Sequence, residues 1–316
     1  MNYKSYCDLA ADVLTAAHKI PGDVDLIVGV PRSGLLAASV LGLNLNKRIC
    51  DLQSFLNNGL VANGKTRSPT GFSFDRVHDA RSVLIVDDSI ATGSSLDQVR
   101  AQVAGCEYKG KVLYMAVYAT DEFKDDLDCF AEVVPLPRIF QWNLFHRVEA
   151  EYYCVDIDGV LCFDPSEQQN DDGKSYRDFL LNATPLARPT YPIGHLVTSR
   201  LEKYRAETEA WLHQRSIKYG HLHMLDLESA EERRRQRIHA SFKADIYSKL
   251  LSTVLFVESE ANQAHEICMR SGKPVLDYGN QKLVHPGFGL SLIMQKNRKM
   301  SARITNKIRH IARQLF

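Results

Sequence analysis

The chain has 316 residues, of which 45% are hydrophobic and 24% are charged, and its formal net charge at pH 7 is +1. This is the composition of an ordinary globular protein, and the length exceeds what one hydrophobic core usually organises, so we expect two domains. A charge so close to zero excludes a global electrostatic field that would recruit nucleic acid.

The seven cysteines lie far apart, their total is odd, and no two of them form a Cys-x-x-Cys pair. This usage fits a reducing cytosol better than a disulfide framework or a zinc site. The N-terminus carries charged residues where a signal peptide needs an apolar stretch, and no segment reaches the length of a membrane span. We therefore expect a cytoplasmic protein.

The first half of the chain alternates helical and strand patterns. Ser5 with Asp8 three residues later resembles a capping box, which predicts a first helix that stops near Pro21. Short apolar segments then alternate with helical stretches at 34–43 and 95–103, and we expect strands at 25–30, 83–86, 112–117 and 131–134. This alternation predicts an α/β domain with a mainly parallel sheet flanked by helices.

A second alternating series predicts another α/β domain of the same kind, with strands at 152–155, 195–197, 254–257 and 274–276. The break between the two series falls near 145–150. We therefore expect domains at 1–148 and 149–290, followed by a C-terminal helix at 291–316. The segment 57–78 is rich in Gly, Asn, Ser and Thr and indicates a long loop, a feature that is often functional in compact domains.

The segment 83–95 runs from a buried strand through the adjacent carboxylates Asp87 and Asp88 into a small-residue loop that opens a helix. Backbone amides at a glycine-bearing helix N-terminus bind phosphate. Two carboxylates at a strand end accept hydrogen bonds from vicinal sugar hydroxyls or lie beside a hydrated magnesium ion. The pattern indicates a phosphorylated sugar as the ligand; the alternative is an acidic turn and a capped helix without a ligand.

This segment resembles the signature of type I phosphoribosyltransferases, which bind 5-phosphoribosyl 1-pyrophosphate (PRPP) there. The upstream segment 26–34 resembles the loop with which that family grips pyrophosphate. The resemblance implies the type I phosphoribosyltransferase fold, with Asp87 and Asp88 on the ribose hydroxyls. It assigns pyrophosphate to the side chain of Arg32 and the amides of Ser33 and Gly34. It assigns the 5-phosphate to the amides of Ala91, Thr92, Gly93, Ser94 and Ser95.

The family closes a mobile loop over the donor, and the segment 57–78 matches that loop. Lys65 and Arg67 are then candidates to neutralise charge as magnesium pyrophosphate departs through an oxocarbenium-like state; the alternative is an ordinary basic surface loop. The acceptor-recognising region varies in the family. Here the aromatic and polar segment 139–146 is either an acceptor pocket or a packed interdomain hinge.

A second chemical site begins where the strand at 152–155 runs into Asp156 and Asp158. The sequence Asp-x-Asp-Gly-Val resembles the first motif of the haloacid dehalogenase (HAD) superfamily. In that family the first carboxylate attacks phosphorus, the second acts as general acid and base, and a magnesium ion lies between them. An EF-hand calcium loop does not fit, because apolar Val160 and Leu161 stand where its ligands should follow.

Later segments match the other motifs of that superfamily. Thr198 stands where a strand-end hydroxyl binds the phosphoryl group, and Lys243 stands where a lysine offsets its charge. Glu258 and Glu260 occupy the fourth motif, which completes the magnesium site of the first motif's carboxylates. The family usually carries aspartates there, and the longer glutamates shift the metal, so a weakly active or retired site stays an alternative.

The resemblance implies a HAD-like Rossmannoid fold, and the motif intervals indicate that its cap is minimal. Roughly 40 residues separate Asp156 from Thr198 and Thr198 from Lys243, which is too few for a large lid with its own core. We therefore expect an open site that suits a bulky substrate. His221 and His223 have no accompanying set of ligands, so we assign them no metal.

The C-terminal segment is basic. From Tyr278 onward the sequence has no acidic residue, and apolar residues in 291–316 recur at helical spacing, which predicts a basic amphipathic helix. This helix either contacts anionic lipid at the inner membrane face, holds an anionic acceptor, or packs its apolar stripe on the domain.

The fusion of the two domains suggests a pathway, because transfer from PRPP leaves a 5-phosphate on the new riboside and the second domain removes phosphates. We expect a Mg²⁺-dependent bifunctional enzyme that transfers phosphoribosyl to a non-nucleobase acceptor, such as a polysaccharide sugar, and then dephosphorylates it to ribofuranose. Such fused proteins resemble components of bacterial surface-glycan pathways. The alternatives are a nucleobase phosphoribosyltransferase coupled to a nucleotidase, and a regulator that senses PRPP without turnover. We expect no nucleic-acid partner and leave a homodimer open.

Overall fold

The computed structural model describes residues 1–61, 73–170, 172–236 and 238–287. The chain divides into two compact units, Met1–Trp142 and Asn143–Phe316. The division comes earlier than the boundary expected at 148. The reason is that Leu144 and Phe145 are buried, and the backbone N–H of Thr190 in the second unit donates to the carbonyl of Phe145.

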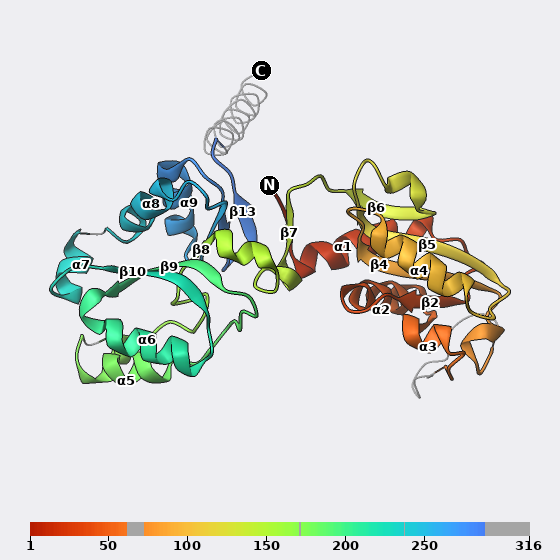
Figure 1. The fold of residues 1–316 in the computed structure, drawn as a ribbon, viewed down its shortest axis with the longest axis horizontal. Coiled ribbons are helices and arrows are strands. Elements are labelled where there is room, and N and C mark those ends of the chain that lie inside the picture. Colours follow the sequence, from red (N-terminus) through yellow and green to blue (C-terminus); the bar gives the residue numbers. More distant parts are fainter. Residues whose placement is uncertain (62–72, 171, 237, 288–316) are drawn as a thin grey trace, which may run out of the picture. The chain divides into compact units, whose positions relative to one another are not determined.

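The first unit is built on a five-stranded parallel sheet in the order β3-β2-β4-β5-β6. Figure 1 labels its strands β2, β4, β5 and β6. Its strands are β2 (Leu26–Gly29), β3 (Arg48–Asp51), β4 (Ser82–Ser89), β5 (Lys111–Ala119) and β6 (Cys129–Val133). Its helices are α1 (Tyr6–Ala16), α2 (Ser33–Leu45), α3 (Leu52–Leu56) and α4 (Ser94–Ala104). A separate parallel pair joins β1 (Asn2–Lys4) to β7 (Arg138–Phe140).

The predicted cap of the first helix is confirmed. The Ser5 hydroxyl accepts a hydrogen bond from the backbone N–H of Asp8, and the Asp8 carboxylate accepts one from the backbone N–H of Ser5. These two bonds satisfy amide groups that a helix start leaves without partners. Leu9 and Val13 of the same helix are fully buried, as the apolar stripe requires.

Helices cover both faces of the first sheet. Leu9 of α1 and Leu41 of α2 belong to one apolar cluster, which contains Leu84 of β4. Val99 of α4 belongs to another, which contains Ile85 of β4. Neighbouring residues of β4 therefore serve opposite faces, as the two-residue period of a strand demands. Because both faces are covered, β4 is a continuous apolar run until it reaches its carboxylates.

The second unit has a six-stranded sheet in the order β10-β9-β8-β11-β12-β13, parallel except for the pair β12 and β13. Its strands are β8 (Tyr153–Val155), β9 (Ile193–Leu201), β10 (Tyr219–Leu225), β11 (Leu255–Glu258), β12 (Val275–Asp277) and β13 (Lys282–Val284). Its helices are α5 (Lys174–Asn182), α6 (Arg205–Gln214), α7 (Ala230–Gln236), α8 (His239–Lys249) and α9 (Ala261–Ser271).

Helices α8 and α9 pack their apolar residues on one face of this sheet, where Tyr247 and Ile267 contact the cluster around Phe256. Helices α5 and α6 pack together on the other side of it (Figure 1). Both units are thus α/β structures with mainly parallel sheets flanked by helices, and the predicted fold class is confirmed.

Within the described ranges, no helix is both long enough and apolar enough to cross a membrane. The predicted C-terminal helix at 291–316, with its proposed lipid or acceptor contact, lies outside the described residues. Lys65 and Arg67 of the expected closing loop lie outside them too.

Two candidate active sites

The first site forms where β4 ends and the chain turns into α4. Gly93 caps the helix with φ of 75°, a left-handed conformation that favours glycine. A Cβ at this position would lie 2.9 Å from the ring of Phe123, so a side chain has no room either. The hydroxyls of Thr92 and Ser94 are 3.0 Å apart at the same turn. The first amides of α4 are therefore presented at a narrow, hydroxyl-rich turn, as an anion site requires.

The predicted pyrophosphate loop lies against the end of β4. Helix α2 begins at Ser33, directly after Arg32, and the Pro31–Arg32 peptide bond is cis. A Cβ added to Gly34 would lie 2.7 Å from the carbonyl oxygen of Val86 and 2.9 Å from the Cα of Asp87. The structure thus brings together two segments that the sequence places far apart, and only glycine allows this approach.

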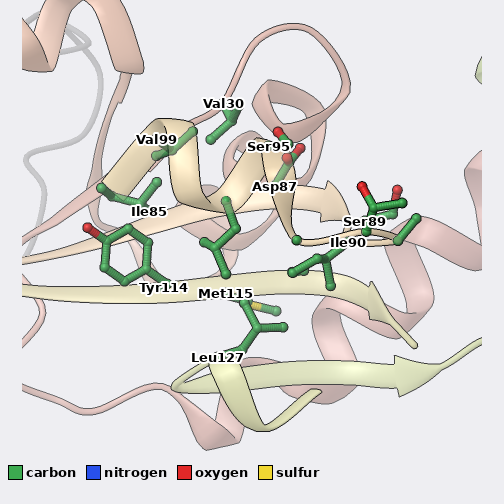
Figure 2. A pocket seen from close by; sticks show the side chains of 15 residues that line it. Val30, Ile85, Asp87, Ser89, Ile90, Ser95, Val99, Tyr114, Met115 and Leu127 are labelled. Atoms are coloured by element: carbon green, nitrogen blue, oxygen red, sulfur yellow. The ribbon is translucent and has the colours of Figure 1, made fainter. Parts of the chain in front are cut away.

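A cavity of about 180 Å³ lies between β4, β5 and α4 (Figure 2). Asp87 and Ser95 supply polar atoms to its wall, while Ile85, Val99 and Tyr114 are among its apolar residues. The predicted residues in its lining are Asp87, Ala91, Thr92, Gly93 and Ser95. The predicted residues outside its lining are Arg32, Ser33, Gly34, Asp88 and Ser94.

Asp87 and Asp88 point to opposite faces of the sheet because they are neighbours on a strand. Asp87 shares the α4 face with Ile85 and lines the cavity. Burial, followed by the negative charge of Asp88, raises the pKa of Asp87 to about 8. The backbone N–H of Asp88 donates to the Oδ1 of Asp87 at 2.8 Å. The two carboxylates therefore form an interacting pair rather than two independent groups.

The Asp88 side chain has a partner that the sequence did not reveal. Its carboxylate is buried, and its Oδ2 accepts a hydrogen bond of 2.8 Å from the indole Nε1–H of Trp142. Trp142 belongs to the segment 139–146, for which an acceptor pocket and an interdomain hinge were both left open. The structure places this tryptophan in the first unit, in contact with the carboxylate pair.

The second site gathers the predicted residues of four separate segments in one place. Asp156 and Asp158 follow β8, Thr198 lies in β9, Lys243 in α8, and Glu258 ends β11. All of them, with Glu260, line one cavity of about 600 Å³. Its other lining residues include Phe163, Asp164, Asn170, Tyr176, His239 and Gln263. The carboxyl ends of parallel strands form this cavity, as expected for an α/β fold.

Lys243 lies at the centre of a buried charge cluster. Its Nζ donates to the Oδ2 of Asp156 at 2.6 Å, to the Oε2 of Glu258 at 2.6 Å and to the Oε1 of Gln263 at 3.3 Å. An ammonium group has three donors, so these acceptors use all of them. Burial opposes the charge of Lys243, but its two carboxylate partners outweigh burial and raise its pKa. The lysine thus holds two carboxylates in fixed positions.

Arg200 was missed by the sequence reasoning, although it follows Thr198 by two residues. It is fully buried, and its Nε and Nη2 donate to the Asp158 carboxylate at 3.0 and 2.6 Å. Burial acts to raise the pKa of Asp158, but the charge and hydrogen bonds of Arg200 outweigh it and lower that pKa. For Asp156, burial dominates over Lys243 and raises the pKa to about 7. Two carboxylates in one cavity thus have environments that push their pKa values apart.

The two glutamates of the fourth motif have different surroundings. Glu258 is buried and accepts from Lys243 and from the backbone N–H of Glu260. Glu260 is the N-cap of α9, and its carboxylate accepts from the backbone N–H groups of Asn262 and Gln263. Within the described ranges, no group of three or more His, Cys, Asp or Glu side chains is arranged to hold a metal ion.

Strand pairing also assembles a histidine cluster whose members do not line either cavity. His195 of β9 pairs in register with His221 of β10, and their rings stack with centroids 4.9 Å apart. The Nδ1 of His195 lies 3.1 Å from the Nε2 of His223. Burial, followed by the two neighbouring histidines, lowers the pKa of His195 to about 4. The sequence reasoning considered His221 and His223 without the third ring.

No protein-family model and no curated protein matches the chain. Among solved structures it is similar to the xanthine-guanine-hypoxanthine phosphoribosyltransferase of Helicobacter pylori, with 19% identity over 45% of this chain and 92% of that one and a TM-score of 0.34. A purine phosphoribosyltransferase from Pyrococcus horikoshii gives 21% identity over 44% and 92%, with a TM-score of 0.32. The UMP synthase of Leishmania donovani gives 14% over 42% and 25%, with a TM-score of 0.26. At these values the similarity does not assign an activity to the chain.

Proposed function

We propose that the chain transfers a 5-phosphoribosyl group from PRPP in its first unit and hydrolyses the resulting phosphate monoester in its second. The observation that carries this proposal is the pairing of two cavities in one chain. One holds Asp87 beside the turn into α4. The other holds Asp156, Thr198 and Lys243.

The first step is supported by what surrounds Asp87. The turn into α4 offers backbone N–H groups and hydroxyls to a phosphate, and α2 starts close to the same point. A carboxylate beside these groups accepts hydrogen bonds from sugar hydroxyls. In the proposed reaction the bond between ribose C1 and pyrophosphate breaks, and an acceptor hydroxyl forms the new bond and loses its proton. Arg32, which directly precedes α2, is proposed to supply the positive side chain that contacts pyrophosphate.

The second step is supported by the charge cluster. Lys243 holds Asp156 so that its carboxylate faces the cavity as a nucleophile towards phosphorus. The ester bond breaks as an aspartyl phosphate forms, and water then hydrolyses this intermediate and regenerates Asp156. Asp158 is proposed as the general acid and base. Arg200 favours its ionised form, which suits the step in which Asp158 takes a proton from the attacking water.

Magnesium is part of this proposal. The candidate ligands Asp156, Asp158, Glu258 and Glu260 offer oxygen donors in one cavity, and Mg²⁺ prefers oxygen and needs only one or two carboxylates besides water and phosphate. The donor set therefore fits the ion in kind. Each of the four carboxylates already accepts a hydrogen bond on both of its oxygens, so a bound ion would share these oxygens with the donors present. Bound magnesium would neutralise charge on the phosphate oxygens.

The presence of a proposed transferase site and a proposed phosphatase site in one chain supports an acceptor other than a nucleobase. A nucleotide-salvage enzyme retains the 5-phosphate that transfer leaves on the product, whereas an enzyme that builds a ribofuranoside removes it. We therefore propose a sugar hydroxyl as the acceptor, of the kind found on a growing polysaccharide. The cavity of the second unit, at about 600 Å³, has room for such a phosphorylated glycoside.

The transferase half is tested by replacing the carboxylate pair. Asp87→Asn with Asp88→Asn should abolish PRPP-dependent release of pyrophosphate, because two amides replace the acceptors of the ribose hydroxyls. Pyrophosphate is measured with a panel of sugar acceptors and nucleobases. Release that the double variant leaves intact contradicts the transferase assignment. Activity with nucleobases alone favours a nucleobase transferase, and binding of PRPP without any release favours a sensor.

A further inference from the structure

The segment between β7 and the second unit contains an aromatic residue that contacts the proposed donor site. The Nε1–H of Trp142 donates to the Oδ2 of Asp88 at 2.8 Å, and Asp88 is only 6% exposed. An indole N–H can only donate, and a buried carboxylate needs donors. Each group therefore satisfies the other, and the bond is of the charge-assisted kind, which is the stronger kind.

The orientation of the indole is fixed by its neighbours. Its ring stacks on Phe140 with centroids 4.8 Å apart and an interplanar angle of 3°, and it lies 6.5 Å from Tyr118. The ring centroid of Tyr6 lies 5.7 Å from that of Trp142, and the backbone N–H of Tyr6 donates to the side chain of Gln141. The pairing of β1 with β7 holds these residues together. The N–H thus reaches Asp88 from a rigid aromatic stack.

Asp88 is in turn tied to the residue that lines the cavity. Its backbone N–H donates to the Oδ1 of Asp87 at 2.8 Å, and the two side chains interact. Adjacent carboxylates repel each other, and within the described ranges neither one forms an ion pair with a cationic side chain. A donor on Asp88 relieves this repulsion without adding a positive charge to the site.

We infer that Trp142 is a positioning residue of the donor site, which holds the Asp88 carboxylate in the orientation that PRPP requires. This inference rests on the proposed function of the first unit. It gives Trp142 a role other than lining an acceptor pocket. Trp142 acts through Asp88 and contributes to donor binding rather than to the chemical step.

The test compares Trp142→Phe with Tyr118→Phe. The first keeps an aromatic ring in the stack and removes the N–H, while the second removes a hydroxyl that bonds Asp12 in the same stack and leaves Asp88 untouched. PRPP binding is measured by calorimetry, and kcat and KM by pyrophosphate release. Loss of one charge-assisted bond should raise the Kd and KM for PRPP about tenfold, with kcat nearly unchanged. Tyr118→Phe should bind PRPP as the wild type does.

A double-mutant cycle separates positioning from packing. If Trp142 acts through Asp88, then Trp142→Phe should add nothing to the Kd of an Asp88→Ala variant, because no acceptor for the indole N–H remains at that position. Additive effects, or an unchanged Kd in Trp142→Phe alone, overturn the inference. A wild type that does not bind PRPP overturns the proposed function instead.

A second measurement does not depend on the folding of any tryptophan variant. The chain has two tryptophans, Trp142 and Trp211, so the ¹⁵N-labelled protein gives two indole N–H signals in NMR spectra. PRPP should shift the Trp142 signal and leave that of Trp211 in place. A Trp142 signal that does not move while calorimetry reports binding contradicts the inference.

Discussion

The two units hold strand-end carboxylates in opposite ways. In the second unit, buried Lys243 forms ion pairs with Asp156 and Glu258, and buried Arg200 forms one with Asp158. In the first unit, within the described ranges, Asp87 and Asp88 have no ion pair, and Asp88 is held by the N–H of Trp142. The ion pairs of the second unit orient its carboxylates before any substrate arrives. Among the described residues, the carboxylate pair of the first unit has no cationic partner, so sugar hydroxyls or a hydrated cation would satisfy its oxygens.

This difference matches the chemistry proposed for each site. A nucleophilic carboxylate must be aimed at one atom, and the Asp156–Lys243–Glu258 cluster fixes it through two bonds of 2.6 Å. A carboxylate pair that binds hydroxyls must keep its acceptor oxygens available, and a buried lysine would occupy them. The cost of the second arrangement is repulsion between Asp87 and Asp88, which raises the pKa of Asp87 beyond the effect of burial.

The largest expected effect comes from removing the cation of the second site. Lys243→Met leaves Asp156 and Glu258 buried without their partner, which should cost about 3–5 kcal/mol in the free energy of unfolding of that unit. Urea denaturation followed by peptide-level hydrogen exchange reports the two units separately. The control, Arg270→Met, removes an exposed pair with Glu266 in the same unit and should leave the unfolding midpoint unchanged. A cost below about 1 kcal/mol for Lys243→Met would show that the cluster is not electrostatically coupled.

A smaller effect on stability is expected in the first site, where the start of α2 lies against the end of β4 and no ion pair between described residues is involved. Gly34→Ala places a Cβ within 3 Å of the backbone of Val86 and Asp87, so the end of β4 must move. We expect the free energy of unfolding of the first unit to fall by about 1–3 kcal/mol, and we expect weaker PRPP binding. Gly22→Ala is the matched control, because a Cβ there meets nothing within 4 Å. The account fails at this point if Gly34→Ala stabilises the unit, as a helical Gly-to-Ala change without a clash would.

Much of the fold follows from local sequence patterns. Some strands are continuous apolar runs that are buried on both faces or nearly so, namely β2, β4, β5, β8 and β11. Such strands can be recognised from the sequence alone. Strand β10 was not predicted. It lies at the edge of its sheet, and its sequence Tyr-Gly-His-Leu-His-Met-Leu is polar where it is exposed, so it offers no apolar run.

The sites were predictable only in part. Motif order was enough to expect Asp156, Thr198 and Lys243 together, and they do line one cavity. The bonds of Arg200 to Asp158 and of Trp142 to Asp88 were not predictable, because the partners are far apart in the sequence and no spacing rule connects them.

Glu260 shows a further limit of the motif reasoning. An acidic residue just before a helix gives the same sequence pattern whether it binds a metal or caps the helix. In the structure, the carboxylate of Glu260 caps α9. The sequence also does not reveal the full histidine cluster, because only the pairing of β9 with β10 brings His195 to His221 and His223.

The most direct test of the two-step account is the mass of the product. Asp156→Asn removes the proposed nucleophile of the second unit and has no part in the transfer of the first, so with PRPP and a sugar acceptor it should accumulate the 5-phosphorylated riboside. The wild type, with magnesium, should release the phosphate-free riboside from the same mixture. The account is contradicted if Asp156→Asn also yields the phosphate-free product, or if the wild type never removes the phosphate.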